Sequence, residues 1–404
     1  MSYESLVLDY IDSKRDEIIE FMKTLLKTES VTGSEAKIGV LMAEECKKDG
    51  LDVELVNPIE GRTSVVARYK GTIGKPKVMM YSHYDTVPPG DLSTWIYPPF
   101  SGKIVEGEIW GRGARDNKIA TCGLTMAFRA LRDLGLKLKG DIVFTHVADE
   151  EKGGHKGFRV LIDRGYGEGV DYLFYGHGGD KESIGIAANG CRQYHIIVKG
   201  KAAHTSRVED GVNAVIKAAK LISHLEKLAN TVNARRYHLP GTDTIMKSRF
   251  SINKCMGYVA NNSIPDTCEV LIDRRFTPAE TAEQTENEIR EVINELKKED
   301  QNFDAEIYTD HANMAMLSVS PSDSLLVKSI QKVAEKVAGI KPNPIGGSHS
   351  SDHGWFVSKH HKPVASYGIG GVGGHSANER IKLDNVILTT KVYALIMLDL
   401  LGTE

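Results

Sequence analysis

Histidine and acidic side chains follow short apolar stretches of this sequence, in places where a strand would end. His83 closes the apolar run that begins at Val78, and Asp85 follows two residues later. Because residues i and i+2 of an extended backbone share one face, Asp85 can lie beside His83 and accept the proton of its second ring nitrogen. The pair alone is equally compatible with an exposed loop histidine beside an acid, so the other strand ends decide between the two interpretations.

The same pattern recurs further along the chain. Asp149, Glu150 and Glu151 follow the apolar run 141–147. Acids clustered at one rim repel one another, so burying them there requires a cation, although a solvated acidic turn is the simpler alternative.

Three more candidates come from glycine-rich segments. Asp116 follows a glycine-rich turn and precedes a predicted helix, where it could also serve only as an N-cap. His177 follows the predicted strand 172–175, and His375 follows the glycine-rich stretch 368–374. Imidazole and carboxylate ligands without thiolates suit zinc, cobalt or manganese in a catalytic site. Together these groups predict a metal centre at the strand ends of one α/β core.

Composition indicates a globular protein that acts on a small molecule. Hydrophobic residues make up 41% of the 404 residues and the net charge is −3, which gives no reason to expect nucleic acid or a membrane as partner. Five scattered cysteines without a CxxC pair favour a reducing compartment. We expect no signal peptide and no membrane span, because no apolar run approaches ~20 residues. The predicted location is the cytoplasm.

Alternating strands and helices would position these groups. Apolar spacing predicts helices over 4–28, 35–48 (with Ser34 as N-cap), 118–134 (with Asn117 as N-cap) and 384–401, and strands over 52–56, 63–70, 77–82, 141–147 and 172–175. This order predicts an α/β fold whose mixed, largely parallel sheet is flanked by helices.

A different pattern interrupts this fold. Strand 191–199, helix 210–229, strands 249–259 and 267–276, helix 279–298 and strand 303–309 follow in turn. The order βαββαβ is that of a ferredoxin-like α+β module. We therefore expect a catalytic domain in two segments, 1–189 and 312–404, with an inserted lid or dimerisation domain over 190–311.

With these motifs in place, the sequence resembles the zinc metallopeptidases and amidohydrolases that include acetylornithine deacetylase, succinyl-diaminopimelate desuccinylase, carboxypeptidase G and related dipeptidases. The resemblance covers nearly the whole chain. It rests on Ser-His83-Tyr-Asp85-Thr-Val-Pro, Gly-Arg-Gly-Ala-Arg-Asp116-Asn-Lys, Asp-Glu150-Glu151 and Gly-Gly-His375-Ser-Ala-Asn-Glu, and in the lid on Lys-Ala-Ala-His204-Thr-Ser, Asn262-Ser-Ile-Pro-Asp and Ile-Asp-Arg-Arg275.

The resemblance implies a set of metal ligands. His83 would bind one metal ion and His375 a second, with Asp116 bridging them and Glu151 completing the shell of the first. Two divalent ions per chain are implied, most often zinc, with cobalt or manganese as alternatives. The peptide bond between Asp116 and Asn117 is implied to be cis.

The resemblance also implies the remaining roles. Glu150 would be the general base and Asp85 would orient His83. On the lid, His204 would reach the site of a neighbouring subunit and stabilise the oxyanion, so a homodimer formed through the lids is implied. Asn262 and Arg275 would hold the substrate's carboxylate.

Two assignments have alternatives. Relatives usually carry Glu or Asp where this chain has His177, which is the predicted fifth ligand, with Asp180 as the alternative. Imidazole in place of carboxylate leaves the cluster about one charge more positive. Arg275 could instead form an ion pair with Asp273 inside the lid.

The predicted function is metal-dependent hydrolysis of the amide bond of an N-acyl amino acid. The alternative is a dipeptidase or carboxypeptidase that acts on short peptides. An inactive metal-binding homologue is less favoured, because a binding module has no need of Glu150 as a base. We expect His349 and His353 to be loop residues near the substrate rather than metal ligands.

Overall fold

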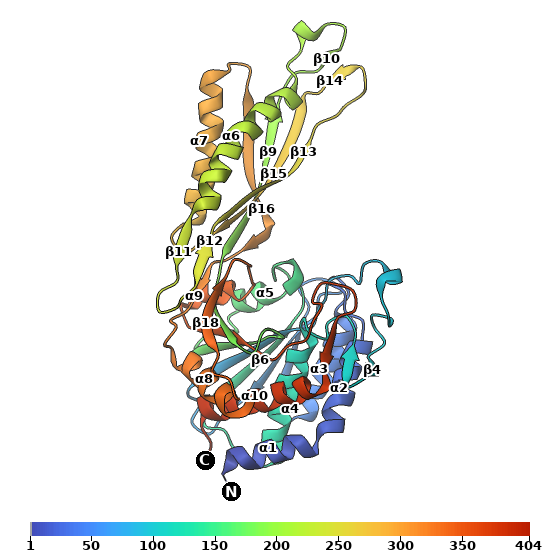
Figure 1. Cartoon of the computed structure of the whole chain (residues 1–404), viewed down its shortest axis with the longest axis vertical. Coiled ribbons are helices and arrows are strands. Elements are labelled where there is room, and N and C mark those ends of the chain that lie inside the picture. Colours follow the sequence, from blue (N-terminus) through green and yellow to red (C-terminus); the bar gives the residue numbers. More distant parts are fainter. Residues whose placement is uncertain (1) are drawn as a thin grey trace.

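A computed structural model describes residues 2–404, apart from the side chains of 311–313. The chain forms a body and a lid that stands on it (Figure 1). Both termini lie at the end of the body opposite the lid. None of the described helices is long and apolar enough to cross a membrane.

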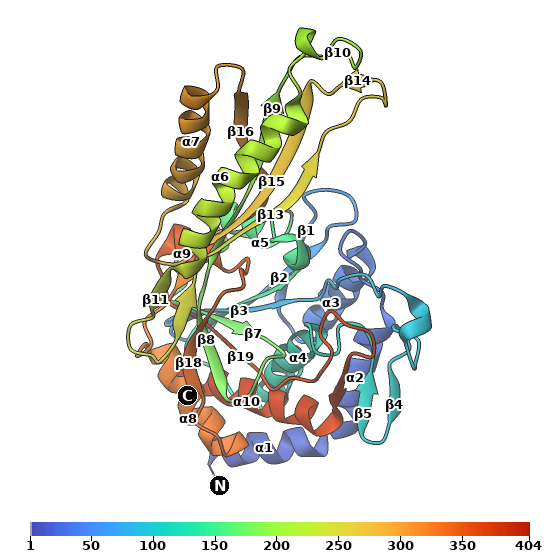
Figure 2. The ribbon, with the colours of Figure 1, turned by 45° about the horizontal axis from the view of Figure 1, so that its top comes forward.

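The body is built on a nine-stranded sheet in the order β1-β2-β6-β3-β7-β19-β8-β17, with β18 paired to β8. Its strands are β1 (Asp52–Val56), β2 (Ser64–Tyr69), β3 (Lys77–His83), β6 (Asp141–Val147), β7 (Tyr172–Gly176), β8 (Ser183–Ala188), β17 (Ser318–Val319), β18 (Asn343–Gly347) and β19 (Val364–Tyr367). The central strands β6, β3, β7 and β19 run parallel, whereas β1, β2 and β17 pair antiparallel (Figure 2). The sheet is therefore mixed, with the predicted parallel order at its centre.

Helices cover the sheet and close the core. They are α1 (Tyr3–Ser13), α2 (Arg15–Lys27), α3 (Ala36–Lys48), α4 (Lys118–Asp133), α5 (Phe158–Asp163), α8 (Leu325–Ala338), α9 (Gly354–His360) and α10 (Leu383–Leu401). The central strands and α4 are rich in apolar residues and are mostly buried, as expected for a parallel sheet that is covered on both faces. A small sheet of β4 (Lys103–Val105), β5 (Glu108–Trp110) and β20 (Arg380–Lys382) lies beside them.

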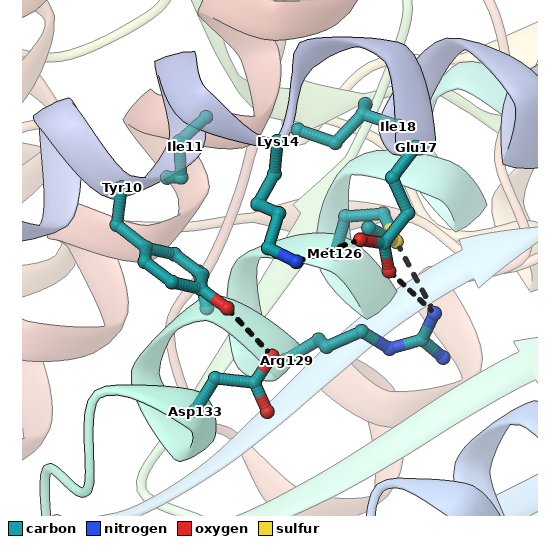
Figure 3. A pocket seen from close by; sticks show the side chains of 9 residues that line it. Tyr10, Ile11, Lys14, Glu17, Ile18, Met126, Arg129 and Asp133 are labelled. Carbon is teal, nitrogen blue, oxygen red and sulfur yellow. Dashed lines mark hydrogen bonds and ion pairs between the residues drawn. The ribbon is translucent and has the colours of Figure 1, made fainter.

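The predicted single helix over 4–28 is wrong, because the chain breaks at Lys14 between α1 and α2. Apolar residues continue on the inner face across the break, so periodicity could not reveal it. The two helices pack on α4, where the Tyr10 hydroxyl donates to Asp133 (2.9 Å) and Arg129 lies 4.0 Å from Glu17 (Figure 3). The space between them is about 10 Å³, room for one water at most, so this is packing and not a ligand site.

The N-cap of α3 is also corrected. Glu35, not Ser34, precedes its first helical residue. The Glu35 carboxylate turns inward, where it accepts from the Gly33 N–H (2.9 Å) and from Arg62 (2.6 Å). This buried ion pair fixes the start of the helix without a side-chain cap.

The lid has the predicted βαββαβ order. It comprises β9 (Gly190–Lys199), α6 (Ala214–Ala234), β13 (Arg249–Met256), β15 (Thr267–Phe276), α7 (Ala282–Glu299) and β16 (Asp304–Ala315). Two small antiparallel pairs accompany them, the hairpin of β11 (Arg236–His238) with β12 (Ile245–Lys247) and the pairing of β10 (Ala203–His204) with β14 (Ser263–Ile264). The antiparallel sheet β13-β15-β9-β16 packs its apolar face on both helices. This is the expected ferredoxin-like lid. The domain limits at residues 189 and 311 stay a prediction.

Candidate metal centre

The central parallel strands bring the predicted groups to one edge of the sheet. His83 is the last residue of β3 and lies opposite Val147, the last residue of the neighbouring β6. The acids Glu150 and Glu151 follow β6 directly, and His177 follows β7 on the other side of β3. Since parallel strands end at the same edge, side chains far apart in the sequence meet there.

Asp116 lies between two imidazoles. Its Oδ1 is 3.2 Å from Nε2 of His83, and its Oδ2 is 3.4 Å from Nε2 of His375. Burial by itself raises the pKa of Asp116, but the contacts with His375 and His83 outweigh burial and hold the pKa well below the usual range. A carboxylate that turns one oxygen to each histidine has the arrangement of a bridging ligand.

Glu151 completes the group. Its Oε2 is 2.9 Å from Nε2 of His375, and ligand atoms of His83, Asp116 and Glu151 all lie within 4.8 Å of one another. Within the described residues, the other oxygen, Oε1, is buried and has no hydrogen-bond partner. An unpaired buried carboxylate oxygen is unfavourable unless a cation binds it. The donor set of imidazole nitrogen and carboxylate oxygen therefore fits divalent metal ions.

Glu150 lies beside this group. One of its oxygens is 3.8 Å from Nε2 of His83, and the other accepts from the Ser351 hydroxyl at 3.4 Å. Burial raises the pKa of Glu150 well above its usual range; the acids Asp352, Glu151 and Asp116 add to this, while His83 opposes it. A carboxyl group with a raised pKa can take up a proton and release it again near neutral pH.

Asp85 has a second task that the spacing did not predict. Nδ1 of His83 is 3.2 Å from the Asp85 backbone oxygen and 3.5 Å from its carboxylate, so the backbone makes the closer contact. The carboxylate oxygens accept from the backbone N–H groups of Glu150 (3.1 Å) and Glu151 (3.2 Å). Asp85 thus fixes the backbone of both acids as well as lying beside His83.

Asn117 links the Asp116 segment to the end of β7. The peptide bond between Asp116 and Asn117 is cis, as predicted. Asn117 precedes α4 but makes no side-chain capping bond, and its Nδ2 instead donates to the Gly176 oxygen (2.9 Å). Asn117 therefore occupies the predicted N-cap position, but its side chain does not cap the helix.

His177 and Asp180 occupy different environments. Burial lowers the pKa of His177 to about 4, so its imidazole is neutral, the form that binds metals, and it is close enough to Asp116 to interact electrostatically. Its ring nitrogens lie outside the compact group of His83, Asp116 and Glu151. Asp180 is exposed, and its carboxylate accepts from the Glu182 N–H (3.1 Å).

The three lid residues lie at opposite ends of the lid. His204 ends the short strand β10 at the far tip of the lid, and Asn262 lies just before its partner strand β14 (Figure 1). Arg275 lies on β15 near the body, where Nη1 donates to Ser350 (3.1 Å) and Nε pairs with Asp273 (3.1 Å). The ion pair with Asp273 that we considered is thus present, together with a contact to the body.

The segment between β18 and α9 supplies Asp352, which sequence reasoning missed, and His353, which was expected to be a loop residue near the substrate. Asp352 is fully buried and accepts from the Tyr81 hydroxyl (2.7 Å), and burial raises its pKa to about 7. His353 is also buried, and its Nδ1 is 2.7 Å from the Ser351 hydroxyl. The only sequence signal for these contacts was the run of polar residues Ser-Ser-Asp-His. The segment has no helix or strand pattern that would have placed it at the site.

An α/β body with a His/Asp/Glu group at its strand ends, a neighbouring carboxyl group and an inserted lid defines a class of metal-dependent hydrolases. Within that class, this chain belongs to the peptidase family M20/M25/M40, whose model matches residues 79–399. The protein is therefore a hydrolase of amide or peptide bonds.

Individual relatives agree with this assignment. A succinyl-diaminopimelate desuccinylase of Paracoccus denitrificans is 28% identical over 383 residues, which cover 92% of this chain and 95% of the relative. A metallo-carboxypeptidase of Sulfolobus solfataricus has a similar structure, with a TM-score of 0.76 and 21% identity over 95% of this chain and 99% of the other. A dinuclear metal-binding peptidase of Bacillus subtilis gives a TM-score of 0.73 and 16% identity over 97% and 100% of the two chains.

Proposed function

We propose that this protein hydrolyses the amide bond of N-acyl amino acids that carry a free carboxylate. The arrangement of Asp116 between His83 and His375, at 3.2 and 3.4 Å, with Glu150 beside it, carries the proposal. The similarity over nearly full length to a desuccinylase, whose substrate is an N-acylated amino acid by its name, supports the substrate class.

We further propose the sites of two metal ions. Asp116, Glu151 and His375 would hold one ion, because Glu151 lies 2.9 Å from His375, and His83, Asp116 and His177 would hold the other. This pairing departs from the expectation that Glu151 joins His83. When bound, such ions polarise the substrate carbonyl and lower the pKa of a bound water towards about 7. Zinc is the proposed metal because imidazole and carboxylate are its common ligands, with cobalt or manganese as alternatives. The neutral form of His177 and its burial favour it over the exposed Asp180 as the fifth ligand.

Glu150 moves the proton in the proposed reaction. Its carboxylate accepts a proton from the attacking water, and the raised pKa allows it to hold that proton while the carbonyl carbon becomes tetrahedral. It then passes the proton to the leaving nitrogen, and Glu150 returns to its carboxylate form. Asp85 keeps Glu150 in place through the Glu150 N–H.

Arg275 would recognise the substrate's carboxylate. It lies on β15, at the end of the lid that meets the body, and its guanidinium already donates to Ser350. A guanidinium can bind a carboxylate with two parallel hydrogen bonds. Ser350 and Arg275 thus mark the place where the carboxylate end of the substrate would lie, and Asn262 is the second proposed carboxylate ligand.

His204 and Asn262 require a second subunit in this proposal. Both lie at the tip of the lid, away from the metal centre of their own chain (Figure 1). We propose a homodimer formed through the lids, in which the tip of one chain supplies His204 to the oxyanion of the other. The cytoplasm remains the proposed location.

Mixing two inactive variants tests this dimer. Glu150→Gln and His204→Ala should each be inactive alone. In a mixed dimer, one site combines an intact Glu150 with an intact His204 from its partner, so activity should return. Homodimers of the two variants kept in separate tubes are the control. No recovery after subunit exchange would contradict the contribution of His204 from the neighbouring chain.

A hydrolysis panel tests the substrate class. Protein stripped of metal and reloaded with Zn²⁺, Co²⁺ or Mn²⁺ is incubated with N-acetyl amino acids, N-succinyl amino acids and dipeptides. Faster turnover of the acylated amino acids is the expected result. Faster turnover of dipeptides would instead identify a peptidase, the function named for the similar metallo-carboxypeptidase. Turnover of none of them would contradict both.

A further inference from the structure

Glu379 ends the motif that contains His375 but takes no part in the proposed reaction. Its side chain is fully buried, with 0% of its surface exposed. A carboxylate buried in this way is unfavourable unless hydrogen bonds and an opposite charge compensate for the lost water. Glu379 must therefore contribute something to the fold or to the site.

Four donors surround the Glu379 carboxylate. Its Oε1 accepts from the backbone N–H groups of Arg115 (2.8 Å) and Asp116 (2.9 Å). Its Oε2 accepts from the Gly113 N–H (3.0 Å) and from Nη1 of Arg112 (2.7 Å). A carboxylate has about four acceptor positions, so all are filled. All four donors belong to the segment 112–116, which ends at the proposed bridging ligand.

Arg112 extends this connection to a third segment. It is 2% exposed, and its guanidinium lies over the ring of Trp95 at 5.2 Å. Its Nη2 is 3.5 Å from the Pro88 oxygen, in the segment that follows His83. The backbone of Glu379 also contributes, because its carbonyl oxygen accepts from the Gly111 N–H (2.9 Å). One ion pair thus joins the three segments that carry His83, Asp116 and His375.

We propose, on the basis of the metal centre proposed above, that Glu379 is a positioning residue for that centre. It clamps the backbone before and at Asp116, so that one oxygen of Asp116 faces His83 and the other faces His375. Because Glu379 lies four residues after His375 in the chain, the same contacts fix the distance between Asp116 and the His375 segment. The site is therefore arranged before a metal ion enters.

The chemistry of the four bonds explains why a carboxylate is needed. Glutamine offers one oxygen and one NH₂ group, and the NH₂ would face donors on Gly113 and Arg112. Glu379→Gln therefore keeps at most two bonds and leaves Arg112 buried without its partner. Glu379→Asp keeps the charge but is one methylene shorter, so it cannot reach both pairs of donors. We therefore expect Glu379→Gln to disturb the segment 112–116 more than Glu379→Asp does.

Two measurements test this role, each well below the unfolding temperature of each variant. The first is zinc affinity, by competition with a chelator. The second is hydrogen exchange at the Arg115 and Asp116 amides of the metal-free protein. We expect Glu379→Gln to bind zinc about 10- to 100-fold more weakly, as found when groups that hold metal ligands are removed. The two amides should exchange faster even without metal.

Glu280→Gln is the matched control. Glu280 is a partly buried carboxylate whose side chain is 9% exposed, and it accepts from the Thr277 N–H (3.1 Å) and from arginines, but it lies in the lid. It should lose stability without any change in zinc affinity or in exchange at Arg115 and Asp116. If Glu280→Gln weakens zinc binding as much as Glu379→Gln does, the effect is general destabilisation and the positioning role is overturned.

The remaining outcomes separate this role from the proposed function. A wild-type protein that binds no divalent metal ion would contradict the metal centre itself. A wild-type protein that binds zinc, together with a Glu379→Gln variant that binds it equally tightly, would overturn only the positioning role. If Glu379→Gln does not fold, Glu379→Asp provides the test: it should show both changes to a smaller extent, and wild-type affinity and exchange would overturn the proposal.

Discussion

The body and the lid use buried charges in different ways. In the body, the charged groups at the strand ends face one another, and no described residue donates a hydrogen bond to one carboxylate oxygen of Glu151. In the lid, Glu280 is paired with Arg235 and Arg274 and also accepts from Thr277, so its carboxylate is fully used within the protein. A carboxylate oxygen without a partner, as in Glu151, can bind a metal ion. A fully paired carboxylate, as in Glu280, stabilises the fold. Changes at the strand ends of the body should therefore alter turnover and metal content, and changes at Arg275 and Glu280 of the lid should alter substrate affinity and stability.

The largest effect is expected for Glu150→Gln. Loss of the proton acceptor should lower kcat by about 10²–10⁴-fold, while metal content stays at the wild-type level because Glu150 is not a proposed ligand. Turnover of an N-succinyl amino acid and metal per chain would be measured on the same sample. Glu60→Gln, at an exposed position, is the control. Wild-type turnover in Glu150→Gln would remove Glu150 from its role.

Metal counts test the two histidines that follow β3 and β7. His83→Ala should lose the ion that it shares with His177, because His83 is 1% exposed and no water can easily replace it. His177→Ala should lose the same ion and leave about one metal ion per chain. Asp180→Ala is the control for His177, since its exposed carboxylate is occupied by the Glu182 N–H. Metal analysis after dialysis gives the counts, and an unchanged count in His177→Ala would exclude it as a ligand.

Arg275→Ala should change substrate affinity rather than turnover. Removing a charged hydrogen-bond donor to a carboxylate costs roughly 1.5–3 kcal/mol, so KM should rise about 10- to 100-fold with kcat nearly unchanged. The control is the same substrate with its carboxylate converted to an amide. The KM for this amide should be the same in wild type and in Arg275→Ala. Steady-state kinetics on both substrates decide the matter. Equal effects on the two substrates would mean that Arg275 acts through the lid fold, for example through Asp273.

The smallest effect is expected at Glu280 and concerns stability at low pH. Burial raises its pKa, but bonds with Ser248, Arg274 and Arg235 outweigh burial and lower it to about 2. The unfolded pKa is about 4.3, so the stabilisation is fully present above that pH and is lost as the pH falls towards 2. Urea unfolding should therefore separate wild type from Glu280→Gln by about 2 kcal/mol at pH 7 and by less at pH 3. A pH-independent difference would contradict this.

The sequence allowed the centre of the fold to be predicted because strand ends and chemistry coincide there. Apolar runs such as 141–147 are long enough to identify a strand, and an acid or histidine directly after each run marks the edge of the sheet. The strand β3 and the acids after β6 therefore lie where the pattern placed them. The βαββαβ order of the lid was predictable for a similar reason, since its two long helices are strongly amphipathic.

Other features depend on contacts that no local pattern records. The break at Lys14 leaves the apolar spacing intact, so one helix was expected where two are present. The Asp85 carboxylate serves the Glu150 and Glu151 amides, which lie far from it in sequence. The strands β8 and β18 and the helix α9 were not predicted because short or glycine-rich segments give no periodic signal. The helix α8 is different, because its 14 residues carry regular apolar spacing and could have been predicted from it.

The position of the lid within the chain has a consequence for synthesis. The body needs its last helix, because α10 packs on α4 and its Tyr393 hydroxyl accepts from the His177 N–H (3.0 Å). The lid is one continuous stretch with its own apolar core. On the ribosome the lid can thus fold while the body is still incomplete, and the first half of the body must wait for the C-terminal segment. A chain that stalls before α10 would present a folded lid on an open sheet, a target for chaperones or proteases.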